Sequence, residues 1–198
     1  MRYATIVVDP PWEVNAGPLC GREGFGDATG KSRPLAYPSM SVVDIAALPI
    51  AELAAQDAHL YLWTINRYLD DAFDVARAWG FNYSTLLTWA KNPMGGGLGG
   101  CYGISTEFVL FCRRGSLRAT DRIGTTWFNW KRPYDERGKP RHSAKPVDFF
   151  SMVERVSPGP RVELFARNPR PGWDSWGNEY RTVSPSALQV TDKAFIFS

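Results

Sequence analysis

The tetrapeptide Asp9-Pro10-Pro11-Trp12 directly follows a short β-branched run, residues 2–8. Two consecutive prolines cannot continue a central strand, so the tetrapeptide is expected at a strand end. The Asp9 carboxylate and the Pro10 carbonyl are both acceptors, and the proline rings fix the backbone that carries them. Such acceptors can take the hydrogens of an aromatic amino group, as in adenine, and free its nitrogen lone pair for attack. Trp12 then offers a flat face on which the base stacks, whereas the alternative is a simple turn capped by Asp9.

Further motifs follow this tetrapeptide in a set order. They are YLWTINRYLDDAFDVARAWGF (61–81), TWAK (88–91), a glycine-rich stretch followed by Glu107, HSAKP (142–146), VELFAR (162–167) and WGNE (176–179). As an ordered set they resemble the DPPW-type, MT-A70-like adenine amino-methyltransferases. That family includes the messenger-RNA N6-adenosine methyltransferase and many bacterial and phage DNA adenine methylases. The resemblance covers residues 3–180, and the ordered set carries it more strongly than DPPW alone.

The resemblance implies an S-adenosylmethionine-dependent N6-adenine methyltransferase that acts on nucleic acid by direct transfer to a flipped-out adenine, without a metal. It implies that Lys145 holds the methionine carboxylate of the cofactor and that Glu163 accepts hydrogen bonds from ribose hydroxyls. The remaining residues implied at the cofactor are Asp9, Leu164, Phe165, Arg167, Asn178 and Glu179. Glu107 is implied near the target base. The loop 168–173 is shorter than in the eukaryotic enzymes, so a cofactor contact from Asn168 is not carried over.

A basic and aromatic segment spans residues 113–143. From Arg113 to Lys145 the chain carries ten Lys or Arg against three acids, a net charge of +7. Interleaved with these charges are four aromatic residues, Trp127, Phe128, Trp130 and Tyr134. Cations mixed with stacking surfaces are typical of nucleic-acid binding, so we expect Lys131 and Arg132 to contact the substrate. A solvated basic loop is the alternative interpretation.

The elements that must position these residues alternate between strands and helices. Apolar runs predict strands over 2–8, 59–63, 84–90, 105–114 and 161–167, and helical spacing predicts helices from Ser41, over 68–79 and over 145–156. This alternation predicts an α/β, Rossmann-like fold with a mostly parallel sheet and helices on both faces. Because the catalytic strand precedes the cofactor strand, the motif order is the permuted, beta-class one. The strands that carry Asp9 and Glu163 should then be neighbours.

Composition and spacing limit the number of domains and exclude several other classes of protein. With 198 residues and 44% hydrophobic residues, the chain predicts one methyltransferase domain, with a catalytic core over 1–181 and a tail over 182–198. Three cysteines and two histidines in no ligand pattern argue against a disulfide scaffold, structural zinc or histidine catalysis. Neither a signal peptide nor a membrane span is visible, which favours a cytoplasmic protein. Residues 24–32 resemble a P-loop, but their glycine spacing is wrong for one.

Three questions stay open at this stage. DNA is favoured over RNA as the partner only by resemblance to the compact DNA enzymes, and a homodimer is compatible with the sequence. A catalytically inactive nucleic-acid-binding scaffold of the same fold is one alternative to the enzyme. An N4-cytosine methyltransferase is another, because the amino group of cytosine poses the same chemical problem.

Overall fold

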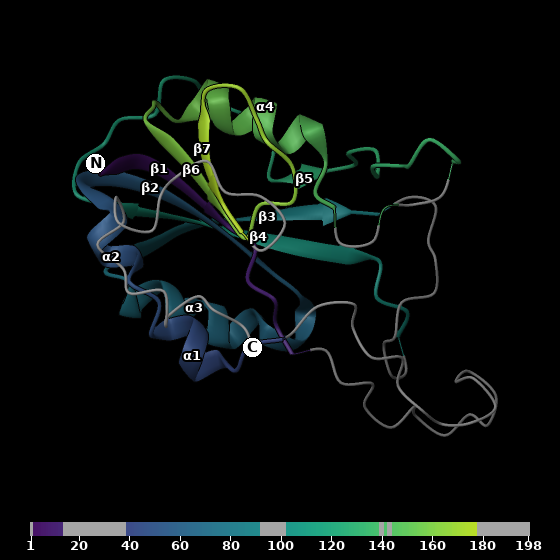
Figure 1. Ribbon diagram of the computed structural model, residues 1–198, viewed down its shortest axis with the longest axis horizontal. Helices are drawn as coiled ribbons and strands as arrows, with labels where there is room; N and C mark the ends of the chain where they lie inside the picture. The colour runs from purple at the N-terminus through teal and green to yellow at the C-terminus, as the bar shows by residue number, and fades with distance from the viewer. Residues whose placement is uncertain (1, 14–38, 92–101, 139–140, 142–143, 178–198) are drawn as a thin grey trace.

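A computed structural model describes residues 2–13, 39–91, 102–138, 141 and 144–177 (Figure 1). The predictions for Asn178, Glu179, the tail over 182–198, the glycine-rich stretch 94–100 and the P-loop-like residues 24–32 lie outside these residues. Within the described part, no helix is long and apolar enough to cross a membrane.

A seven-stranded sheet forms the centre of the molecule, in the order β5-β3-β4-β2-β1-β6-β7. The strands are β1 (Tyr3–Val8), β2 (Ala54–Thr64), β3 (Asn82–Ala90), β4 (Thr106–Arg114), β5 (Trp127–Phe128), β6 (Arg161–Leu164) and β7 (Trp173–Trp176). The first strand lies between β2 and β6, and Val8 pairs with Leu62 on one side and Leu164 on the other. The predicted neighbourhood of the Asp9 and Glu163 strands is confirmed.

The sheet is mixed: β4 runs against its neighbours, whereas the other six described strands share one direction, so the expectation of a mostly parallel sheet holds with one exception. The pairs β1–β2, β1–β6, β6–β7 and β3–β5 are parallel, but β4 runs antiparallel to both β2 and β3. Antiparallel neighbours need no crossover connection, and β4 pairs in this way with the strand before it in the chain as well as with β2. These two long antiparallel ladders lie in the middle of the sheet.

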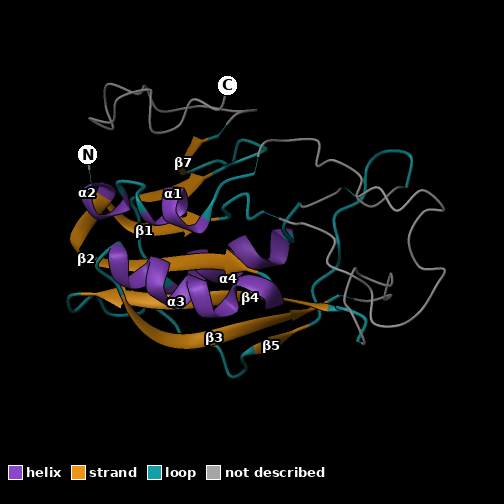
Figure 2. Ribbon diagram, turned by 90° about the horizontal axis from the view of Figure 1, so that it is seen from below, coloured by secondary structure: helices purple, strands orange, loops and turns teal. Residues whose placement is uncertain are grey.

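Helices cover both faces of the sheet, as predicted (Figures 1 and 2). One face carries α1 (Val42–Ala46), α2 (Ile50–Leu53), the 3₁₀ turn η1 (Asn66–Tyr68) and α3 (Leu69–Ala78), and the other carries α4 (Val147–Val156). The side chain of Ser41 caps α1 by accepting a hydrogen bond from the amide of Asp44. Beyond α3, Gly80 adopts a left-handed φ of 79°, as expected of a glycine after a helix end.

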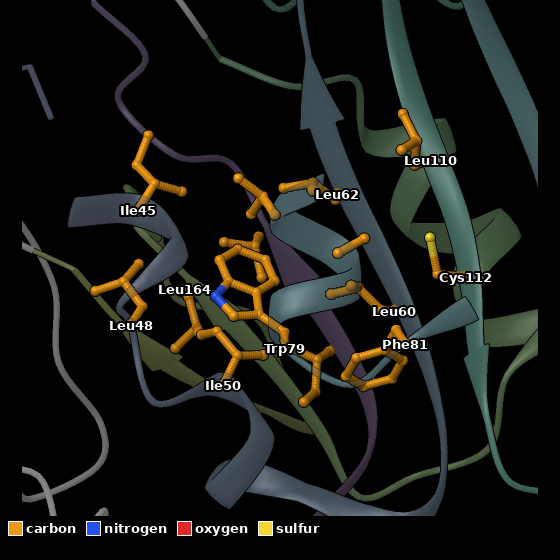
Figure 3. Packing of buried hydrophobic residues seen from close by; sticks show 14 of the residues in the cluster. Ile45, Leu48, Ile50, Leu60, Leu62, Trp79, Phe81, Leu110, Cys112 and Leu164 are labelled. Carbon is orange, nitrogen blue, oxygen red and sulfur yellow. The ribbon is translucent and has the colours of Figure 1, made fainter. Parts of the chain in front are cut away.

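Two apolar clusters fill the space between sheet and helices. Under α1 and α3, Trp79 packs among Ile45, Ile50 and Leu60, all fully buried (Figure 3). Under α4, Phe149 packs against Trp63 at 4.7 Å between ring centroids. Burial of these large side chains is the main contribution that holds the strand ends in place.

The strand predicted over 161–167 is shorter than expected. It ends at Leu164, because Phe165 takes a positive φ of 62° that no strand continues. The chain turns there toward the cavity described below.

Candidate active site

Charged side chains gather at one edge of the sheet. Asp9 follows β1, Lys91 follows β3, and Glu163 lies near the end of β6, so all three lie at carboxyl ends of strands. Glu107 lies at the opposite end of its own strand, near the start of β4. Because β4 is antiparallel, that start meets the same edge, and Glu107 pairs with Trp89 close to the end of β3.

Lys145 lies at the centre of this group. Its Nζ is 3.0 Å from Asp9 Oδ1 and 2.9 Å from Glu107 Oε2. The second oxygen of Glu107 pairs with Lys91, so the charges alternate along the cluster. The side chains of Lys145 and Glu107 are only 11% and 12% exposed, and the ammonium lies over the ring of Trp63 at 4.7 Å. Lys145 is therefore a largely buried member of this cluster and not an exposed lysine before α4.

The electrostatics of the cluster favour a charged Lys145 and Glu107. Burial raises the pKa of Glu107, but Lys145 and Lys91 lower it more strongly, to about 2. Burial lowers the pKa of Lys145, and the two carboxylates reverse this and raise it above its ordinary value. Burial raises the pKa of Asp9; Lys145 lowers it, Glu107 raises it, and the net pKa stays above the ordinary range. Asp9 is thus the best proton acceptor of the three groups.

A cavity of about 260 Å³ opens beside Asp9 and Lys145. Its lining includes four of the predicted cofactor residues besides Lys145, namely Asp9, Glu163, Phe165 and Arg167. Burial raises the pKa of Glu163 to about 7, with Arg170 lowering it and Asp9 raising it. The structure thus brings residues far apart in sequence around one space next to the DPPW segment.

Leu164 is the exception among those predicted cofactor residues that the structure describes. It is fully buried in the core under α1, and it is not part of the cavity lining. Successive side chains of a strand point to opposite faces, so Leu164 faces the core when Glu163 faces the cavity. Its side chain therefore does not line the cavity, and a cofactor contact from Leu164 stays a prediction.

Trp12 also differs from its predicted role. Its side chain is 5% exposed, stacks on Tyr68 at 5.2 Å between centroids, and donates from Nε1 to the Trp63 carbonyl at 2.9 Å. The ring therefore presents no open face for a base in this structure, which corrects the stacking prediction. Its contacts instead fix the backbone that follows Asp9.

Both proline carbonyls of the tetrapeptide accept backbone hydrogen bonds. The Pro10 carbonyl accepts from the Trp12 amide at 2.8 Å, and the Pro11 carbonyl accepts from the Met40 amide at 2.8 Å. A carbonyl oxygen has two lone pairs, so Pro10 keeps one acceptor position for a ligand. These bonds hold Pro10 and Pro11 in the rigid arrangement expected of them.

Lys131 and Arg132 lie apart from the cavity lining, with Lys131 exposed and Arg132 half-buried. Their segment nevertheless reaches the site, because Pro133 and Arg141 line the cavity and the Arg141 amide donates to the Pro133 carbonyl. Trp130 anchors the segment by stacking on Phe128 at 4.2 Å. Residues 115–138 are mostly irregular.

Several site residues were missed from the sequence. Lys91 belongs to the TWAK motif, but no role in the site was predicted for it. None was predicted for Arg170 or Phe150 either. For Lys91, a cation directly after a predicted strand was an available signal. Arg170 carries no comparable signal, because its place depends on the turn of the short loop before β7.

The WGNE motif contacts the segment that follows β6, where Gly177 lies against the backbone of Ala166. A Cβ at Gly177 would lie 2.3 Å from the Ala166 carbonyl oxygen, closer than any side chain allows. The Ala166 amide donates to the Trp176 carbonyl at 3.1 Å, which holds the two segments together. Glycine at 177 is therefore required by close approach of two backbones.

No group of three His, Cys, Asp or Glu side chains arranged to hold a metal ion occurs among the described residues. The cluster and the cavity lie beyond strand ends of an α/β sheet, where ligands of such folds bind. Fold and site together define a small-ligand-binding enzyme of the α/β class.

Comparison with known proteins identifies the family. The sequence matches the MT-A70 family over residues 3–179. It is 29% identical to the Type II methyltransferase M.MunI of a Mycoplasma species, over 90% of this chain and 78% of that protein. It is 27% identical to mouse N(6)-adenine-specific methyltransferase METTL4, over 89% of this chain and 37% of that protein. It is 23% identical to human N(6)-adenosine-methyltransferase catalytic subunit METTL3, over 90% of this chain and 28% of that protein.

The chain therefore belongs to the MT-A70 family. It spans most of the Mycoplasma protein but well under half of the two mammalian proteins.

Proposed function

We propose that this chain, a nucleic-acid adenine methyltransferase of the MT-A70 family, transfers a methyl group from S-adenosylmethionine to the N6 atom of an adenine held at Asp9 and Pro10. The observation that carries the proposal is the Asp9 carboxylate, fixed beside both Lys145 and a cavity that Glu163 lines. Positioned acceptors and an adjoining ligand cavity are what direct methyl transfer requires.

The cavity residues fit S-adenosylmethionine. Glu163 offers acceptors for ribose hydroxyls, and Lys145 and Arg167 offer cations for the carboxylate of the methionine part. When bound, the cofactor supplies an electrophilic methyl group on its sulfonium sulfur. Neither a metal nor a covalent enzyme intermediate enters this proposal.

Asp9 and Pro10 act on the amino group of the base. The Asp9 carboxylate accepts one N6 hydrogen, and the second acceptor position of the Pro10 carbonyl takes the other. With its raised pKa, Asp9 also accepts the proton that nitrogen loses on methylation. Lys145 holds the carboxylate in place through its 3.0 Å contact.

We also propose that the motifs follow the permuted, beta-class order of methyltransferases. Asp9 follows the first strand of the chain and Glu163 lies on the sixth, yet these strands pair in parallel. Adjacent strands bring acceptor and cofactor sites together at their carboxyl ends despite the long stretch of chain between them.

We propose DNA as the polymer, with the basic and aromatic segment 113–143 as its contact surface. The segment borders the cavity through Pro133 and Arg141, so a nucleic acid bound there would bring a flipped base toward Asp9. Its charge supports binding to phosphates in general, which DNA and RNA share.

Mass spectrometry of nucleosides tests the proposal. The purified protein is incubated with S-adenosylmethionine and with DNA or RNA of mixed sequence, and the digested products are compared. N6-methyladenine from DNA is the expected result. N4-methylcytosine would identify the cytosine enzyme, and no product together with no cofactor binding would identify the scaffold.

A further inference from the structure

The side chain of Tyr68 holds the DPPW segment from the start of α3. Tyr68 is the last residue of η1, directly before α3, and is 8% exposed. Its ring stacks on Trp12 at 5.2 Å between centroids, with the two planes 17° apart. Its hydroxyl donates to the Glu13 carbonyl at 2.5 Å. One side chain thus contacts both residues that follow the two prolines.

Tyr68 is itself fixed to the end of β2. Its carbonyl accepts from the Thr64 hydroxyl at 3.1 Å, and its amide donates to the Ile65 carbonyl at 3.0 Å. The neighbouring Trp63 carbonyl accepts from the Trp12 indole at 2.9 Å. Because β2 also pairs with β1, the strand before the DPPW segment, both ends of that segment are held by the same strand.

These contacts act on the Pro10 carbonyl through Trp12. The Trp12 amide donates to that carbonyl at 2.8 Å, and only Pro11 separates the two residues. Proline fixes φ at about −65°, so little rotation of the chain between them is left. A displacement of the Trp12 ring therefore moves the Pro10 carbonyl as well. Asp9 is held separately, by its 3.0 Å contact with Lys145.

We propose that Tyr68 is a positioning residue for methyl transfer, which orients the Pro10 carbonyl through its contacts with the two residues after the prolines. The inference rests on the proposed function, in which this carbonyl accepts one N6 hydrogen. An acceptor that is fixed beforehand needs no reorganisation in the transition state, and a misplacement of about 1 Å can cost about a hundredfold in rate. Neither Tyr68 nor Trp12 lines the cavity, so the effect falls on the transfer step and not on cofactor affinity.

The Tyr68 hydroxyl takes no part in proton transfer. Burial raises the pKa of Tyr68 above its ordinary value, so the hydroxyl stays protonated and keeps donating at the pH of an activity assay. Its contribution to the rate is then independent of pH, whereas that of Asp9 is not. Loss of the hydroxyl should lower the pH–rate profile without shifting its acid limb.

Single-turnover methylation measures the transfer step apart from product release, with cofactor-saturated enzyme in excess over the polymer that yields N6-methyladenine. Tyr68→Phe keeps the ring on Trp12 but loses the bond to Glu13, so the rate should fall about threefold to tenfold. Tyr68→Leu also loses the stacking, and the rate should fall about tenfold to a hundredfold. Calorimetry should find the affinity for S-adenosylhomocysteine unchanged in both variants.

Two control variants separate positioning from a general loss of stability. Tyr83→Leu removes an exposed tyrosine on β3 that lies edge-on to Phe73 at 4.9 Å. Trp79→Phe loosens the core under α1 and α3, where Trp79 is fully buried, and should lower the melting temperature. Both should transfer the methyl group at the unaltered rate at a temperature where they are folded.

The outcomes are separable. An unchanged single-turnover rate in Tyr68→Leu would overturn the positioning role and leave the proposed function standing. A fall in rate with an equal fall in affinity for S-adenosylhomocysteine would also overturn it, because a loosened site would then explain the loss. An equal fall in rate in Trp79→Phe would do the same. If the unaltered protein forms no N6-methyladenine, the proposed function itself fails.

Discussion

The ammonium of Lys145 lies 3.0 Å from Asp9 Oδ1, and this contact links the DPPW segment to the chain just before helix α4. The same ammonium contacts Glu107, so one cation neutralises two carboxylates at the sheet edge. The cluster is an electrostatic unit, and each of its members affects the others.

Replacement of Lys145 should therefore destabilise the fold. Lys145→Met leaves two largely buried carboxylates near each other without their shared cation, at a cost of about 3–5 kcal/mol in the free energy of unfolding. Urea denaturation measures this. The double variant with Glu107→Gln should recover part of the loss, and Arg155→Met, which breaks the exposed pair with Asp121, should leave the midpoint unchanged. An unaltered midpoint for Lys145→Met would contradict the account.

Asp9→Asn tests the chemical role directly. The amide keeps the shape of the side chain but loses one acceptor and all basicity, so kcat should fall by about 10²- to 10³-fold. Binding of S-adenosylhomocysteine should persist. In the unaltered enzyme the raised pKa of Asp9 places the acid limb of the rate above the ordinary carboxylate range, with activity lost as pH falls. Asp121→Asn serves as control, and near-normal turnover in Asp9→Asn would refute the mechanism.

Glu163 predicts a pH-dependent cofactor affinity. Its pKa of about 7 in the free protein means that the carboxyl is protonated below this pH, whereas ribose hydroxyls donate to the ionised form. Binding must then release a proton, so affinity for S-adenosylhomocysteine should fall as pH drops below about 7, by at most about tenfold per pH unit. Calorimetry between about pH 5.5 and 8.5 measures the slope. Glu163→Gln should remove it, and a slope that survives this change would have another origin.

The corrected role of Trp12 has its own test. Trp12→Phe keeps a ring against Tyr68 but leaves the Trp63 carbonyl without its indole donor, which should cost about 1–3 kcal/mol. Trp12→Ala should cost about 3–5 kcal/mol. Thermal and urea denaturation measure both. A Trp12→Phe variant with full stability but a raised KM for nucleic acid would restore the original prediction that this ring stacks on the base.

Charge reversal at Lys131 and Arg132 tests the nucleic-acid surface. If both contact phosphates, the double change to Glu should weaken DNA binding and lower the salt dependence of log K by about 2. Fluorescence anisotropy over a salt series measures this slope. Arg77→Glu on α3, where Arg77 is paired with Asp74, is the matched control. Equal binding by the double variant would move the contact surface to another face.

Hydrophobic periodicity and the residues at element ends predicted most of the strands and helices. The strand over 105–114, the helix start at Ser41 and the helix over 68–79 are local features, and each was found where its residues indicated. The Asp9–Glu163 neighbourhood also followed, because strand order was constrained by the motif order. Local sequence patterns are sufficient to predict an element when its conformation depends mainly on residues close by in the chain.

The remaining features depend on partners distant in sequence. The Lys91–Glu107 pair exists because β4 runs antiparallel, which alternation along one strand cannot reveal. Burial of Trp12 depends on Tyr68 and Met40, which belong to other elements. Arg170 reaches Phe150 only through the turn of its loop. These contacts depend on tertiary packing, so the sequence alone did not predict them.

The central position of β1 has a consequence for synthesis of the protein. This strand is made before β6, with which it pairs, and Thr5 also donates to the Pro158 carbonyl about 150 residues later in the chain. During translation one edge of β1 therefore stays unsatisfied until nearly the whole domain has left the ribosome. Pairing at such separation slows folding, and Asp9 acquires its neighbours Lys145 and Glu163 only at the end. A nascent chain thus carries the DPPW segment long before it carries an active site.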